Sequence, residues 1–167
     1  MRCGPVTFLL LALAGCGSEP SGGDGYGFSL TAEFPDRVIT AAGDSALWGS
    51  VRPGLAINLV VTQGADSIAP PFRLLFRGEN AGLETASPTL GTFPAFGTLD
   101  EPKILVTASS GRWTGFASAG TVTLAAVDAE TLRGSFDLVL ARAVGAVAIA
   151  DLPVTGTFVA RHTPAVP

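Results

Sequence analysis

Hydrophobic and polar residues alternate with a period of two from residue 26 onward, and turn-forming residues interrupt the alternation at short intervals. This pattern is typical of antiparallel strands with one buried face. It is clearest over residues 132–140, where Phe136, Leu138 and Leu140 share one face and Asp137 lies on the other. No stretch from residue 26 onward has the 3.6-residue period of a helix. The pattern therefore predicts an all-β domain over residues 26–163.

The predicted strands are separated by short segments rich in Gly, Pro, Asp and Ser. They cover residues 26–33, 37–42, 46–51, 55–62, 72–77, 103–108, 112–118, 121–125, 132–140 and 153–161. The short gaps favour antiparallel hairpins, since parallel pairs require crossovers of a dozen or more residues. A set of about 8–10 mostly hairpin-connected strands predicts an antiparallel β-sandwich or a flattened β-barrel. We favour the sandwich, or a flattened barrel that grades into it, although the sequence does not reveal closure.

The segment 78–102 departs from this rhythm because it is long and rich in Gly, Pro and Thr. Loops of this length in compact domains are usually functional or contain an element of their own. We expect a short edge strand near residues 91–93 within a mobile loop. Pro94 suits an edge, since proline cannot donate to a strand ladder.

The aromatic residues offer candidates for a contact surface and for the core. Phe93, Phe96 and Trp113 are the candidate contact surface for a partner, and the alternative for the two phenylalanines is that they cover an open end of the core. Trp48, Trp113 and Tyr26 could form a platform on which a sugar stacks, but such residues more often fill a β core. We expect Trp48 in the core.

The amino terminus has the features of an export signal. Arg2 is followed by a short apolar stretch at residues 6–14, which falls short of the about 20 residues needed to span a bilayer. The stretch ends in Leu-Ala-Gly-Cys at residues 13–16, which resembles the bacterial lipobox, an aliphatic residue and two small residues before an obligatory cysteine. We therefore predict a signal peptide over residues 1–15 and lipidation of Cys16. An ordinary signal peptide with a chance cysteine, or a start codon elsewhere, is the alternative.

A membrane anchor at Cys16 places the domain at the bacterial cell envelope. Residues 16–25 are predicted to form the lipidated cysteine and a flexible Gly/Ser-rich tether, and residues 164–167 a disordered tail. Gly17 follows the cysteine in place of the aspartate that favours retention at the inner membrane, so the outer membrane is expected.

Composition narrows the class of protein. Hydrophobic residues make up 47% of the chain and charged residues 14%, which excludes disorder for most of it. The net charge is −4, and the charged residues are scattered singly without a run of Lys or Arg. Nucleic acid is therefore not an expected partner. Cys3 would leave with the signal peptide, so the mature domain would have no cysteine for an internal disulfide.

No residue pattern predicts catalysis or metal binding. The single histidine, His162, lies near the carboxyl terminus, where we expect a frayed surface position rather than an ordered general base. Zinc sites need clustered Cys and His. The acidic turn residues lack the spacing of a calcium loop and more often bond their own backbone. We expect no enzyme activity, no metal and no cofactor.

Several strand sequences resemble those of a group of uncharacterised bacterial lipoproteins that carry a lipobox, a short Gly/Ser tether and one all-β domain. The similar segments are residues 46–49, 91–93, 120–124, 132–137 and 154–160. The resemblance implies the location and the fold, and it supplies no activity or site residues.

These observations favour a non-enzymatic binding or accessory module that contacts an envelope protein or a glycan through its loops. The alternative is a lipocalin-like carrier of a small apolar ligand, which predicts an internal cavity of roughly 300–1,000 Å³. A purely structural surface protein is a third hypothesis.

Overall fold

The computed structural model describes residues 25–34, 37–43, 45–51, 54–61, 72–79, 88–96, 101–110, 113–144 and 147–164. Within them the chain forms ten strands, and the all-β prediction is confirmed. The strands are β1 (Gly27–Phe34), β2 (Arg37–Gly43), β3 (Ser45–Val51), β4 (Gly54–Val61), β5 (Phe72–Glu79), β6 (Gly91–Pro94), β7 (Lys103–Ser110), β8 (Trp113–Val127), β9 (Thr131–Val144) and β10 (Val147–His162).

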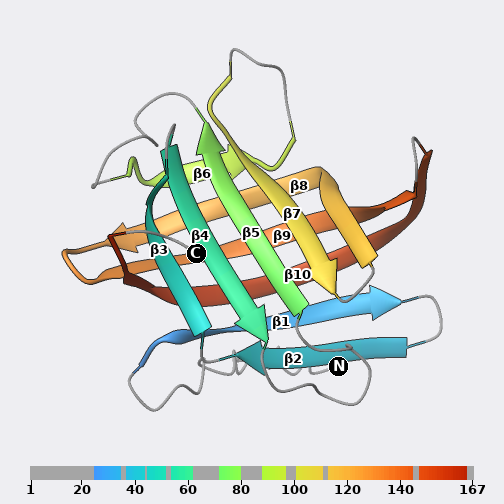
Figure 1. Cartoon of the computed structure of the whole chain (residues 1–167), viewed down its shortest axis with the longest axis horizontal. Helices are drawn as coiled ribbons and strands as arrows, with labels where there is room; N and C mark the ends of the chain where they lie inside the picture. Colours follow the sequence, from blue (N-terminus) through green and yellow to red (C-terminus); the bar gives the residue numbers. More distant parts are fainter. Residues whose placement is uncertain are drawn as a thin grey trace, which may run out of the picture.

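Seven of these strands form a closed barrel in the order β10, β3, β4, β5, β7, β8, β9 and back to β10. The pairs are antiparallel except β10 with β3, where Arg161 pairs with Leu47 and His162 with Trp48 in parallel. This short parallel pair closes the barrel, so the architecture is the flattened barrel and not two separate sheets. Strands β3, β4, β5 and β7 form a front layer that crosses β8, β9 and β10 behind it (Figure 1).

The back layer extends beyond the barrel because two of its long strands, β8 and β10, each pair with two different strands along the same edge. Strand β10 pairs with β1 through residues 154–159 and with β3 only at its end. Strand β8 pairs with β7 at its start and with β6 through residues 121–124. The back layer is thus a six-stranded sheet in the order β2, β1, β10, β9, β8, β6. The edge strand expected near 91–93 is present as β6.

Strand β8 is one continuous strand, whereas the sequence predicted separate strands at 112–118 and 121–125. The register with β9 shifts between Ala117 and Ala119, which marks a bulge. Gly120 follows with a φ of 108°, a backbone conformation that residues with a side chain rarely adopt. Bulge and glycine bend the strand without ending it, and the bend carries β8 from the front layer into the back sheet (Figure 1).

The core lies between the two layers and contains large side chains. Trp48, Phe28, Phe76 and Phe158 are each at most 1% exposed, so the expectation that Trp48 belongs to the core is confirmed. The ring of Phe76 on the front layer lies 5.5 Å from that of Phe136 on the back layer, measured between centroids. Contacts of this kind tie the two layers together, and burying each such aromatic side chain stabilises the fold by about 2–3 kcal/mol.

Candidate functional site

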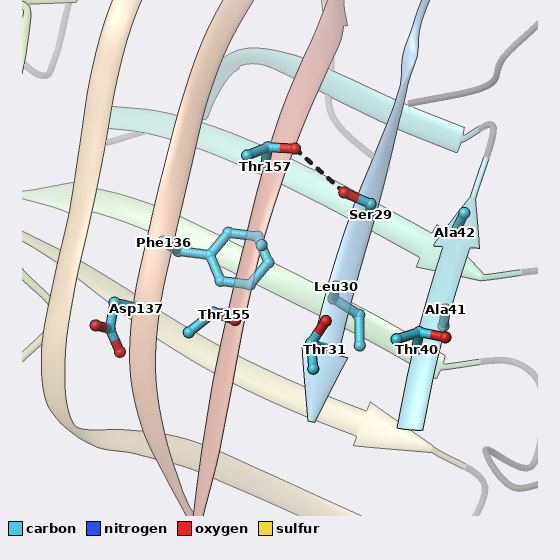
Figure 2. A pocket seen from close by; sticks show the side chains of 11 residues that line it. Ser29, Leu30, Thr31, Thr40, Ala41, Ala42, Phe136, Asp137, Thr155 and Thr157 are labelled. Carbon is cyan, nitrogen blue, oxygen red and sulfur yellow. Dashed lines mark hydrogen bonds between the residues drawn. The ribbon is translucent and has the colours of Figure 1, made fainter. Parts of the chain in front are cut away.

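A hollow of about 520 Å³ lies against strands β1, β2, β9 and β10 of the back sheet (Figure 2). It is open to solvent, and its lining combines hydroxyl and carboxylate side chains with apolar residues such as Leu30 and Phe136. The lining residues are Ser29, Leu30, Thr31, Thr40, Ala41, Ala42, Phe136, Asp137, Thr155, Gly156 and Thr157.

Strand register places the polar side chains of the hollow in two neighbouring rows. In one row Asp137 pairs with Thr155, Thr155 with Thr31, and Thr31 with Thr40. In the next row Thr157 pairs with Ser29. The Oγ1 of Thr157 and the Oγ of Ser29 are 3.2 Å apart and hydrogen-bonded, as Figure 2 shows.

These hydroxyls face outward because the sequence alternates. Leu30 lies between Ser29 and Thr31 and is 2% exposed, and Phe136 beside Asp137 is 4% exposed. Successive side chains of a strand point to opposite faces of a sheet. Because the buried residues pack one face of the back sheet against the core, the hydroxyl side chains lie on its opposite face.

Both rows continue beyond the hollow onto β8 and β6. The first row extends from Asp137 to Thr121, and the second from Thr157 through Ser135 and Thr123 to Thr92. Thr92 and Thr123 are also hydrogen-bonded, with their Oγ1 atoms 2.9 Å apart. We call this surface the hydroxyl face, and it consists of Ser29, Thr31, Thr40, Thr92, Thr121, Thr123, Ser135, Thr155 and Thr157, all exposed or half-buried.

The chemistry of the hydroxyl face is hydrogen bonding. Each Ser or Thr hydroxyl donates one hydrogen bond and accepts others. Asp137 is the charged side chain within the two rows. The arrangement offers several hydrogen-bonding groups to a molecule that enters the hollow.

The predicted contact residues have different environments. Phe93 is only 8% exposed, and its cross-strand partner, Val122, is 0% exposed. Its ring is part of the core, so the prediction that Phe93 supplies contact surface is wrong. Phe96 is 61% exposed and stays a candidate. Trp113 begins β8, but its side chain is outside the described part of the structure. The predicted lipidation site, Cys16, and the predicted signal peptide also lie outside the described residues.

Asp128 is a turn residue whose carboxylate bonds its own turn. Its carboxylate accepts hydrogen bonds from the backbone N–H groups of Glu130 and Thr131 at 2.9 and 2.7 Å, and from the Thr131 hydroxyl. These bonds, with Thr131 contributing most, lower the pKa of Asp128 below 3.8. Among the described residues, no group of three or more His, Cys, Asp or Glu could hold a metal ion.

His162 is exposed as expected, but its position is not frayed. Its ring lies 4.7 Å from that of Trp48, and its backbone N–H donates to the carbonyl of Glu130 at 2.6 Å. It is the last residue of β10 and contributes to the parallel pair that closes the barrel. The ring contact and the backbone hydrogen bond hold this end of β10 in place.

No family model, curated protein or solved structure was found to match this chain. Across the residues that the structure describes, no helix has the length and apolar character needed to cross a membrane.

The hydroxyl face was not predicted from the sequence, although the sequence contains a signal for it. Hydroxyl residues occur two positions apart at 29 and 31, at 121 and 123, and at 155 and 157, and a further one occurs at 92. Their assembly into rows depends on the pairing of β1 with β10, which joins the two ends of the domain.

Proposed function

We propose that this chain is a bacterial envelope lipoprotein, held at the membrane by acyl chains on Cys16, whose barrel is a non-enzymatic module that binds through its outer surface. The observation that carries the binding role is the hollow on the back sheet, which is open and whose lining includes Ser, Thr and Asp side chains that can form hydrogen bonds. The lipobox-like residues 13–16 and the Gly/Ser-rich tether support the anchor.

The packing of the barrel weighs against a lipocalin-like carrier. A carrier needs an internal cavity for its ligand. Here Trp48, Phe76 and Phe158 occupy the space between the layers, and Phe76 contacts Phe158 with ring centroids 6.0 Å apart. Binding outside the barrel leaves this packing intact, whereas binding inside would displace it.

The anchor follows from the energetics of acyl chains. Each buried CH₂ contributes about 0.8 kcal/mol, so one chain holds a protein only marginally, while two or more hold it firmly. A lipidated cysteine carries several chains on one residue. The water-soluble barrel could then remain at the membrane without inserting any strand.

Replacing the cysteine tests the anchor. Cys16→Ser is expected to move the protein from the membrane fraction to the soluble fraction and to abolish incorporation of labelled palmitate. Cys3→Ser is the matched control, since Cys3 is predicted to leave with the signal peptide, and this variant should stay membrane-bound and labelled. A Cys16→Ser protein that remains in the membrane fraction would contradict the proposal.

A further inference from the structure

The hydroxyl face extends over six strands, which is more surface than a small ligand would use. We propose that it binds an extended neutral carbohydrate chain, seated in the hollow and running across the strands toward β6. This inference names the ligand of the binding module proposed above, so it rests on the binding role. It does not depend on the lipid anchor.

Hydrogen-bonding chemistry favours a sugar chain. Sugar hydroxyls both donate and accept hydrogen bonds, and Ser and Thr hydroxyls can serve either function by rotating. The threonine methyl groups supply small apolar contacts for the C–H faces of the rings. Cross-strand hydrogen bonds hold Ser29 to Thr157 and Thr92 to Thr123, which preorganises both ends of one row.

Charge favours a neutral ligand over an anionic one. The two rows contain one carboxylate, Asp137, and no basic residue. Arg133 and Arg161 are exposed on the same face of β9 and β10, but they lie in neighbouring rows and not in the two rows that carry the hydroxyls. Recognition of phosphate or polyanions commonly uses clustered Arg and Lys, and the two rows themselves contain none.

The dimensions of the face fit an extended chain. Strands lie about 4.8 Å apart, so six of them span roughly 24 Å, while alternate residues along a strand are about 6.7 Å apart. The two rows therefore define a strip several times longer than it is wide. A linear oligosaccharide of several units matches this shape better than a compact ligand.

Hydroxyl side chains are more frequent on the back sheet than on the front layer. On the front layer, the row across β3, β4, β5 and β7 consists of Leu47, Asn58, Leu75 and Thr107. Thr107 on β7 is an exposed front-layer threonine and supplies a matched control.

Calorimetric titration of the purified full chain, kept in mild detergent, tests the proposal. The probes are chitotetraose, cellotetraose and maltotetraose, with polygalacturonate as the anionic comparison. We expect binding of at least one neutral probe and none of polygalacturonate. Replacing Thr155 and Thr157 together by valine, which removes two hydroxyls with little change of shape, should weaken binding by about tenfold or more.

Two further variants make the result specific. Thr92→Val with Thr123→Val should also weaken binding of the longer chain, whereas Thr107→Val should leave it unchanged. Equal unfolding midpoints for all variants would show that the fold is intact, and the second pair keeps the test valid if the first pair does not fold.

Several outcomes would overturn the inference. They are absence of binding to every neutral probe, tighter binding of polygalacturonate, unchanged affinity in both double variants, or an equal loss in Thr107→Val. If the wild type binds no oligosaccharide but co-purifies with a membrane protein that the double variants do not retain, the partner is a protein instead. That last result would leave the proposed binding role standing and reject only the carbohydrate ligand.

Discussion

The ring of Phe136 on β9 lies against Gly156, its direct cross-strand partner on β10. A Cβ atom at Gly156 would collide with this ring and with the carbonyl oxygen of Ser29 on β1. Three strands therefore approach one another at a position without a side chain. The same relationship occurs between Phe158 and Gly134, which are also paired across β10 and β9.

We predict that Gly156→Ala destabilises the barrel by about 1–3 kcal/mol, the usual cost of overpacking a tight core. The added methyl group must displace either the Phe136 ring or the backbone of β1. Urea unfolding of the purified protein measures the change in free energy.

A double-mutant cycle identifies the cause. Phe136→Ala removes the ring, so Gly156→Ala should cost less in that background than in the wild type, because the two residues share one space. Additive effects of the two substitutions would contradict a direct collision.

A second prediction concerns the bend of β8. Gly120 has a φ of 108°, and a Cβ there would meet the backbone of Asp137 and Leu138. Gly120→Ala should therefore destabilise the fold by at least about 1–3 kcal/mol, since strained backbone and steric overlap act together. Gly91→Ala is the control, because Gly91 has a φ of 147° but the nearest side-chain atom to its Cβ would be 3.8 Å away. Thermal unfolding should show a clearly larger loss for Gly120→Ala, and equal losses would refute this account of the bend.

The parallel pair that closes the barrel gives a third prediction. The rings of His162 and Trp48 are in contact, and the backbone N–H of Thr163 donates to the carbonyl of Trp48 at 2.8 Å. His162→Ala should cost about 1 kcal/mol and accelerate hydrogen exchange of the Thr163 amide, because local opening becomes easier. His162→Phe keeps an aromatic ring and should restore most of the protection. Unchanged exchange in His162→Ala would show that the ring contact does not hold the closure.

The turn between β8 and β9 predicts a specific dependence of stability on pH. The pKa of Asp128 is lowered in the folded protein, chiefly by the Thr131 hydroxyl. A lowered folded-state pKa means that the carboxylate contributes stability above its ordinary value of 3.8, and that this contribution is lost as the pH falls further.

Asp128→Asn serves as the reference for this effect. The wild type should be more stable than the variant near neutral pH, and the difference should shrink below pH 3.8. Urea unfolding across this range measures it. A difference that stays constant at lower pH would contradict the assigned role of the carboxylate.

Much of the strand pattern was predictable because the alternation of buried and exposed residues is local. Phe136, Leu138 and Leu140 were placed on one face of their strand from the sequence, and all three are buried. Pro94 indicated an edge strand correctly. The break expected after residue 118 was wrong, since a glycine within a strand can mark a bend as well as a turn.

The closure of the barrel and the hydroxyl face were not predictable because they depend on contacts between distant residues. The pairing of His162 with Trp48 and that of Ser29 with Thr157 join opposite ends of the domain. Phe93 was misassigned for the same reason, since its burial depends on pairing with Val122 rather than on neighbouring residues. The location at the envelope stays a prediction from residues 13–16, which precede the described part of the chain.

Intact-mass and amino-terminal peptide analysis of the protein purified from its native membranes tests the central claim most directly. The account predicts a chain that begins at Cys16 and carries the added mass of a diacylglycerol group on that residue. A chain that begins elsewhere, or a Cys16 without acyl mass, would contradict it.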